Sequence, residues 1–251
     1  PALEQQLGSG ERAAAAAQAP RAALWTPRVG VACLAVEAAL LMSGFFDATL
    51  PQHLEDALGP IPISVVSIVV SVRSLWYLVA SYLVTLAMER WLSFEALIML
   101  GSLASAAGMA LAALARTGET PTAATEAAPA AWCAQLAALV VQTTGYAMLF
   151  IPSLPLMQSE ARRRGLSSQQ AEETASLFMM AMSSGEALGP LLGGWLVGCV
   201  GFRTAASLWS CIFWVVLLLA FLAYDSDVVA ARRASGSAEG EEGEAGAGLT
   251  A

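Results

Sequence analysis

Lysine is absent from this sequence of 251 residues, and charge of either sign is scarce. Charged residues make up 13% of the chain, whereas hydrophobic residues make up 57%. A soluble globular domain carries about 25% charged residues, roughly twice that share. The chain therefore has too few polar side chains to coat a large soluble core, and a lipid bilayer would remove that need. The composition argues against an ordinary soluble domain and indicates a membrane protein.

Residues that build metal sites and disulfides are equally sparse. Histidine occurs once, at His53, beside Glu55 and Asp56, and we expect it on a solvated loop. The cysteines lie far apart in apolar runs and form no CxxC pair, which is typical of small buried side chains. They are Cys33, Cys133, Cys199 and Cys211. We expect neither a metal nor a cofactor.

Motifs of the common enzyme classes are missing as well. The chain contains no G-x-S-x-G, P-loop or HExxH motif, so we expect no enzyme activity. Basic clusters with interleaved aromatic residues are also missing, which argues against nucleic-acid binding. The net charge of −8 owes much to the C-terminal segment GSAEGEEGEAGAG, so it is a poor guide to partners.

Long apolar runs are abundant, and each is near the ~20 residues that a helix needs to cross a bilayer. We predict an all-α membrane protein with six transmembrane helices. The fourth helix is predicted to end at the helix-disrupting segment IPSLP. The predicted spans are Val29–Leu50, Ile63–Ala87, Phe94–Leu114, Ala131–Ile151, Ala175–Cys199 and Ala205–Tyr224.

Arginines between the spans predict the orientation. Nine lie on one side and two on the other, so both chain ends are expected in the cytoplasm. The nine are Arg12, Arg21, Arg28, Arg90, Arg162, Arg163, Arg164, Arg232 and Arg233; the two are Arg116 and Arg203. We divide the chain into a cytoplasmic linker (1–26), a six-helix bundle (27–225) and a disordered acidic cytoplasmic tail (226–251).

Glycine is concentrated in the fifth span. Small residues let helices approach closely in lipid, where water drives no association. The four-residue spacing of Gly185, Gly189 and Gly193 places them on one face, and Gly194 belongs to an adjacent stripe. This face is either a static helix seam or a surface across which helix bundles rock. Pro190 removes a backbone donor and is expected to bend the helix.

Four charged residues lie inside the predicted spans, where charge is costly and indicates function. They are Glu37, Asp47, Arg73 and Glu186. Helical rise places all of them near mid-membrane except Asp47, which is placed near the far end of the first span. We therefore predict that Arg73 pairs with Glu186 or Glu37 around a wet cavity; the alternative is a static ion pair that only fixes helices.

Polar and aromatic side chains are candidates to line the same cavity. In the fourth span these are Gln142 and Tyr146, flanked by threonines, and the alternative is that they form hydrogen bonds between helices. In the second span, Trp76, Tyr77 and Tyr82 either offer a cation an aromatic face or serve as packing residues.

Three segments resemble vesicular amine transporters, a branch of the major facilitator superfamily. FFDATLP (Phe45–Pro51) is similar to the end of their seventh helix and FIPSLPLM (Phe150–Met157) to the end of their tenth. GEALGPLLGGWLVGCVGF (Gly185–Phe202) resembles their eleventh helix, and Arg90–Trp91 stands where their eighth-to-ninth loop ends. The resemblance covers about residues 27–225 and is strongest to the polyamine branch.

The resemblance implies the C-terminal six-helix half of a carrier that works by alternating access and exchanges protons for an organic cation. Asp47 matches the family's acidic position. Phe150 and Met179 stand where monoamine carriers have acids, which argues against a monoamine substrate. The lipid bilayer, the solute, protons and a missing N-terminal half are the implied partners, in a vesicle, another endomembrane or the plasma membrane.

Three alternatives remain at this point. The first is a drug or metabolite exporter of the same superfamily. The second is a membrane scaffold or receptor that transports nothing, and the third is a nonfunctional fragment. The first residue is Pro1, and the first apolar run begins too far into the chain for a signal peptide. We therefore expect a piece of a longer protein.

Overall fold

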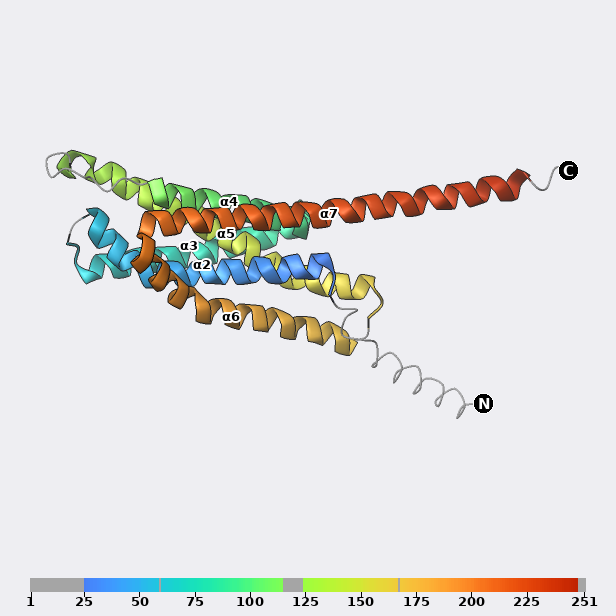
Figure 1. The fold of residues 1–251 in the computed structure, drawn as a ribbon, viewed down its shortest axis with the longest axis horizontal. Helices are drawn as coiled ribbons and strands as arrows, with labels where there is room; N and C mark the ends of the chain where they lie inside the picture. The colour runs from blue at the N-terminus through green and yellow to red at the C-terminus, as the bar shows by residue number, and fades with distance from the viewer. Residues whose placement is uncertain (1–24, 59, 115–123, 167, 248–251) are drawn as a thin grey trace.

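The structure, a computed structural model, describes residues 25–58, 60–114, 124–166 and 168–247. Its elements in these ranges are all α-helices, without a strand, which confirms the all-α class. The helices lie side by side with roughly aligned axes, and α7 continues past the others (Figure 1). They are α2 (Pro27–Leu58), α3 (Ile63–Arg90), α4 (Phe94–Leu114), α5 (Ala124–Arg163), α6 (Ser168–Val200) and α7 (Phe202–Ala247).

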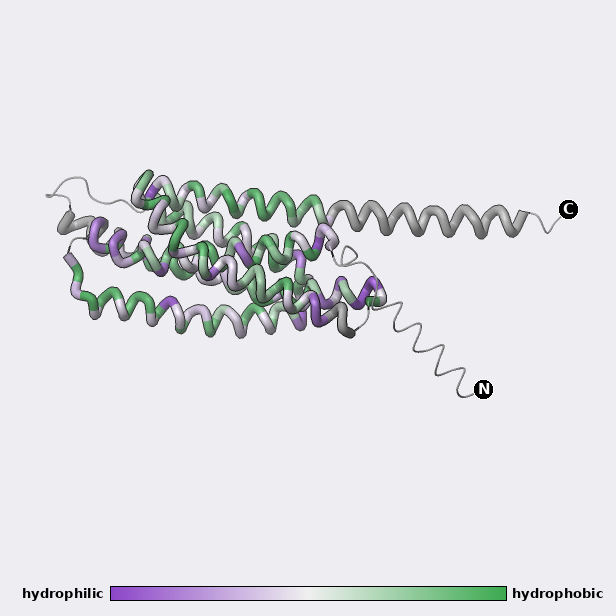
Figure 2. The backbone as a smooth tube through the Cα atoms, turned by 60° about the horizontal axis from the view of Figure 1, so that its bottom comes forward, coloured by the Kyte–Doolittle hydropathy of each residue, from purple (hydrophilic) through white to green (hydrophobic). Residues whose placement is uncertain are grey.

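Five of the described helices are long and apolar enough to cross a membrane. The stretches are Pro27–Asp56, Ile63–Arg90, Phe94–Leu114, Trp132–Arg163 and Phe202–Tyr224. Hydrophobic residues run along most of these helices, and hydrophilic residues gather toward helix ends (Figure 2). α6 forms where the fifth span was predicted but is less apolar, because glycines, serines, Glu186 and Pro190 stand among its apolar residues. By length and composition, the chain is a multi-pass membrane protein.

The outer surface of α3 is apolar. Ile68, Leu75, Leu78 and Tyr82 are each more than 60% exposed, whereas soluble monomers rarely present such large apolar patches to water. α3 packs chiefly on α5 and scarcely approaches α2. Most of its side chains are therefore placed to face lipid or another helix bundle.

The core of the bundle is built around α2. This helix packs against α5, α6 and α7, and α4 fills the space between α5 and α7. Met42, Phe45 and Phe46 of α2 are essentially fully buried, and the Phe45 ring stacks on Phe202 of α7 with 5.5 Å between centroids. α2 therefore holds one face in the core while its other residues are free to build a site.

Two predicted helix ends are wrong, and prolines are the reason. α2 continues through Pro51 to Leu58, and α5 continues through the prolines of IPSLP to Arg163. A proline inside a helix removes one backbone hydrogen bond, and membrane helices tolerate this where packing and neighbouring groups offset the loss. Hydroxyls near these prolines bond other carbonyls of the same helices: Thr49 donates to the Phe45 carbonyl at 2.7 Å, and Ser153 donates to the Leu149 carbonyl at 2.6 Å.

The C-terminal part of the chain also differs from the expectation. α7 runs to Ala247, so the backbone of 226–247 is helical where composition predicts disorder. This segment is rich in alanine and glutamate, which have high helix propensity and oppose the effect of its glycines. The last four residues of the predicted tail and residues 1–24 of the predicted linker lie outside the described residues.

Candidate functional site: an ion pair between α2 and α3

Arg73 of α3 reaches across to α2. Its guanidinium forms an ion pair and a hydrogen bond with the Asp47 carboxylate and donates a second hydrogen bond to the Ser43 hydroxyl at 2.8 Å. Its Cζ atom lies 5.9 Å from the centroid of the Phe46 ring, within the range of a cation–π contact. The side chain of Arg73 is 11% exposed and that of Asp47 is 55% exposed, so the pair lies at the edge of an open face.

The prediction that Arg73 pairs with Glu37 or Glu186 is wrong, because Asp47 is its partner. The error came from ending the first span at Leu50. Since α2 continues to Leu58, Asp47 lies eleven residues from that end, and Arg73 lies ten residues from the start of α3. At ~1.5 Å per residue, both are about 15–17 Å from the same side of the bundle.

Ser43 and Phe46 were not among the candidate residues. Ser43 lies four residues before Asp47 and therefore on the same face of α2, a spacing that the sequence already contains. Phe46 was overlooked because the aromatic residues of α3 were considered instead. Of these, Trp76 donates its indole N–H to the Thr144 hydroxyl of α5 at 3.0 Å, so it serves packing between helices.

Tyr146 and Glu186 bring two more helices to this face. Tyr146 of α5 lies within electrostatic reach of Arg73, Asp47 and Glu186 of α6. The Glu186 side chain is exposed. The ion-pair site thus joins α2 and α3, and Tyr146 of α5 is electrostatically coupled both to it and to Glu186 of α6, so this region holds two carboxylates and one guanidinium.

Both carboxylates of this face precede a proline by four residues. The pairs are Asp47 with Pro51 and Glu186 with Pro190, each within a continuous helix. Proline has no N–H, so the helix supplies no backbone donor for the carbonyl of either acidic residue. Each acid thus combines a carboxylate with a backbone carbonyl that receives no N–H from the residue four positions on. The sequence contains this acid-x-x-x-Pro repeat, and its first copy is the acidic part of the FFDATLP motif.

A row of aromatic side chains runs from α3 through α5 to α6. Tyr77 and Tyr146 have ring centroids 5.1 Å apart, Tyr146 stacks on Phe150 at 5.7 Å, and Phe150 contacts Phe178 at 5.4 Å. Aromatic pairs at these distances attract each other and stiffen the surface they form. Tyr82, another aromatic candidate, is 70% exposed on the outside of α3.

Glu37 lies apart from Arg73, at the contact between α2 and α6. It is half-buried and accepts a hydrogen bond from the Ser184 hydroxyl at 3.4 Å. It lies ten residues from Asp47, or about 15 Å along the helix. Glu37 is thus placed on the same helix as the ion pair but closer to the predicted cytoplasmic side.

Gln142 is not on the open face. It is fully buried in α5 and packs against α4, where a Cβ added at Gly108 would lie 2.7 Å from the Gln142 Cβ. Its Oε1 accepts a hydrogen bond from Thr143 at 3.3 Å, and among the described residues its Nε2 has no hydrogen-bond partner. The prediction that Gln142 lines the cavity is therefore wrong, because this side of α5 faces α4.

The glycines of α6 form a backbone seam with α2. A Cβ added at Gly185 would lie 2.7 Å from the Leu40 Cβ, and one added at Gly193 would lie 2.8 Å from the Phe45 Cα. At Gly189 it would lie 2.8 Å from the Leu41 carbonyl oxygen. Both sides of this seam belong to one bundle, which is the geometry of a static contact. α6 remains helical through Pro190 and curves in its C-terminal part (Figure 1).

Gly194 is not part of the seam, since no atom lies within 4 Å of a Cβ added there. The stripe that includes Gly194 therefore faces away from α2.

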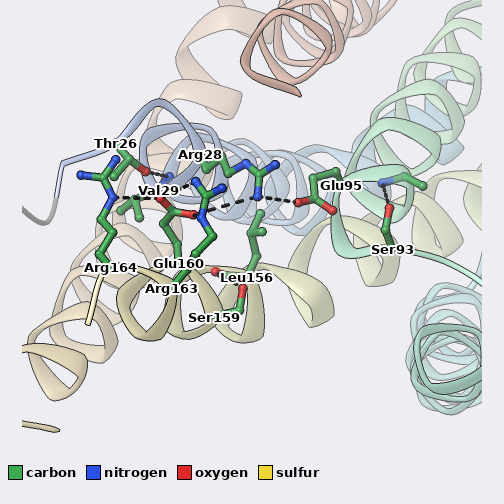
Figure 3. A network of polar contacts seen from close by, with 11 residues as sticks. Thr26, Arg28, Val29, Ser93, Glu95, Leu156, Ser159, Glu160, Arg163 and Arg164 are labelled. Atoms are coloured by element: carbon green, nitrogen blue, oxygen red, sulfur yellow. Dashed lines mark hydrogen bonds and ion pairs between the residues drawn. The ribbon is translucent and has the colours of Figure 1, made fainter. Parts of the chain in front are cut away.

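A network of charges joins helix ends (Figure 3), at the end of the bundle that lies opposite the α2–α3 loop (Figure 1). The Glu160 carboxylate is 2% exposed and contacts Arg163 and Arg164, with both closest distances at 3.0 Å. Arg28 at the start of α2 lies 3.3 Å from Glu95 and 4.0 Å from Glu160. The arginines that predicted the orientation therefore also connect α2, α4 and α5, a role that sequence spacing did not indicate.

His53 is buried, so the expectation of a solvated loop residue is wrong. α2 extends past Pro51 and carries His53 into the bundle, where its ring stacks on Phe202 with 3.6 Å between centroids. Its Nε2 lies 2.8 Å from the Nε2 of Gln135. His53 thus connects α2 to α5 and α7 instead of facing water.

Comparison of the chain with protein-family models, curated proteins and solved structures gives no match in any of the three. The functional interpretation therefore depends on the geometry of the site and on the sequence motifs.

Proposed function

We propose that this chain is the C-terminal six-helix half of a major facilitator carrier that moves a small organic cation, amine- or polyamine-like, by alternating access. One observation carries the proposal. The Arg73–Asp47 ion pair lies within the helices, and Tyr146 is electrostatically coupled to it and to Glu186, so two carboxylates stand against one guanidinium in this region. Charge is costly in lipid and usually marks a wet pathway, so the excess negative charge favours a cationic solute or protons.

Two further features support a carrier. The face is lined by aromatic rings that suit an organic cation, and the acid-x-x-x-Pro repeat adds carbonyl oxygens to its two carboxylates. The motifs of Phe45–Pro51 and Gly185–Phe202 resemble those of vesicular amine transporters. In the proposed carrier a second helix bundle closes the face from the other side, both ends of this chain lie in the cytoplasm, and protons move opposite to the solute.

Uptake of a labelled polyamine, spermidine, into proteoliposomes under a pH gradient tests this proposal. The assay uses protein expressed from the full transcript, which is first sequenced upstream of the codon for Pro1. We expect saturable uptake that Asp47→Asn reduces about tenfold, a loss of about 1.4 kcal/mol, since the variant removes the carboxylate that would pair with the solute. The matched control is Glu89→Gln, an exposed carboxylate at the end of α3, which leaves uptake unchanged.

The second candidate function is a membrane scaffold without transport. The observation that favours it is the ion pair itself, because Arg73 neutralises Asp47 and ties α3 to α2 without any solute. In that case spermidine uptake is at background for every variant, while Asp47→Asn still lowers thermal stability. Uptake of uncharged drugs instead of spermidine would identify an exporter of the same superfamily.

A further inference from the structure

We propose that Arg73 is a built-in occupant of the cation site on α2, and that a cationic solute binds by displacing it. The site consists of the Asp47 carboxylate, the Ser43 hydroxyl and the Phe46 ring, and we refer to it as the α2 cation site. These groups lie on one turn and a half of a single helix, so they form a unit that does not require α3 for its shape. The displacement step, but not the site, rests on the proposed transport function.

The chemistry of the contacts fits a guanidinium or a primary ammonium. The carboxylate supplies the opposite charge, the hydroxyl accepts an N–H at 2.8 Å, and the ring lies 5.9 Å from the cationic carbon. Pro51 adds the Asp47 carbonyl, for which the helix has no N–H donor. All four features recognise a small organic cation in general, and nothing in them is particular to arginine.

The position of Arg73 makes it removable. α3 packs on α5 and scarcely approaches α2, so the arginine side chain spans a gap between backbones that are not in close contact. Asp47 is 55% exposed beside this contact, which leaves a path by which a solute reaches the carboxylate. Glu186 and Arg73 both lie within electrostatic reach of Tyr146, so a second carboxylate stands in the region into which a displaced guanidinium would move.

A tethered competitor lowers the apparent affinity for a free cation by a predictable amount. A side chain held next to its site acts at an effective concentration in the millimolar range. If this effective concentration is about ten times the dissociation constant of the Arg73 guanidinium for the α2 cation site, the tethered side chain weakens binding of a free cation about tenfold. Removing the guanidinium should therefore strengthen binding, although it deletes a polar contact.

Chemical rescue tests the site directly. Arg73→Ala in purified protein leaves Asp47 unpaired and opens a space the size of a guanidinium. Methylguanidinium at ten times its dissociation constant should then raise the Tm of Arg73→Ala by about 3–5 °C relative to equal sodium chloride. The double variant Asp47→Asn/Arg73→Ala should show no such rise, and Ser43→Ala/Arg73→Ala a smaller one. An equal rise in all three variants, or none in Arg73→Ala, would overturn the inference.

A second variant covers the case in which Arg73→Ala fails to fold. Arg73→Gln keeps a long polar side chain without the charge and should bind labelled spermidine about tenfold more tightly than the unchanged protein. Arg90→Gln, an exposed arginine at the end of α3, is the control and leaves the affinity unchanged.

The two ideas fail differently. If the unchanged protein transports spermidine but Arg73→Gln binds it no better, the inference is wrong and the carrier stands. If methylguanidinium rescues Arg73→Ala through Asp47 but spermidine neither binds nor moves, the site stands and the proposed function is wrong.

Discussion

α2 contacts α6 and α3 in opposite ways. Along α6, glycines bring the two backbones together, so that a single added methyl group would meet main-chain atoms at Gly189. Toward α3 the backbones stay apart, and a single arginine side chain crosses to Asp47 and Ser43. Close backbone packing tolerates no change, whereas a side-chain bridge can be exchanged for another cation. The difference indicates that α2 is fixed on one side and adaptable on the other.

The largest effect on thermal stability is expected at the glycine seam between α2 and α6. Gly189→Ala places a Cβ 2.8 Å from the Leu41 carbonyl oxygen, and overpacking of this kind costs about 1–3 kcal/mol. Gly194→Ala is the matched control, because nothing lies within 4 Å of its Cβ and alanine is the better helix former. Thermal unfolding in detergent should show a lower Tm for Gly189→Ala and an equal or higher Tm for Gly194→Ala. Equal losses in both would mean that α6 does not pack on α2 through this face.

The Arg73–Asp47 ion pair should contribute less to the free energy of unfolding. Because Asp47 is half-exposed, we expect Asp47→Asn and Arg73→Gln each to cost about 1 kcal/mol of stability, near the upper value for accessible ion pairs. A double-mutant cycle should give a coupling free energy of similar size, since both substitutions remove one interaction. Additive losses would mean that the ion pair does not form. The cycle is measured by thermal unfolding in detergent at low salt, where the coupling is strongest.

The attachment of α3 to α5 gives a third, comparable effect. Thr144→Val keeps the shape of the side chain but removes the hydroxyl that accepts the Trp76 N–H at 3.0 Å, a loss of about 1 kcal/mol. The matched control is Tyr82→Phe, whose hydroxyl is on the exposed side of α3 and whose loss should leave Tm unchanged. If the two variants behave alike, α3 is held by its apolar contacts alone.

The smallest effect is expected at Gln142. Its Nε2 is buried without a hydrogen-bond partner in the described part of the chain, so an apolar side chain of similar size costs little or stabilises. Gln142→Met should leave both Tm and spermidine uptake within error of the unchanged protein. A loss of uptake at unchanged Tm would restore the interpretation that Gln142 lines the transport pathway.

Apolar periodicity and length predicted the helices well, since a run of ~20 apolar residues has few other structures available. The span Phe94–Leu114 coincides with α4, a helix that contains no proline. The ends at Pro51 and IPSLP were wrong, since proline breaks helices in water but is tolerated inside a packed bundle.

The site could be predicted only in part for the same reason. Asp47, Arg73 and Glu186 were identified from the cost of charge in lipid, but pairing depends on helix ends and on helix rotation. One misplaced end at Leu50 moved Asp47 out of the reach of Arg73 in the predicted arrangement. Ser43 follows from helical spacing once Asp47 is chosen. The burial of Gln142 depends on which helix packs against that side of α5, and the sequence alone does not determine this.

Labelling of single cysteines in proteoliposomes tests most directly whether water reaches Asp47 on α2 while the outer side of α3 faces lipid. In a background with the four native cysteines replaced, Asp47→Cys and Leu75→Cys lie at similar depth, and both positions are exposed in the isolated bundle. A charged, membrane-impermeant thiol reagent should modify Asp47→Cys and leave Leu75→Cys unmodified. Equal modification of both cysteines would contradict the account, because the apolar side of α3 would then be in water. Protection of both would also contradict it, because water would then not reach Asp47.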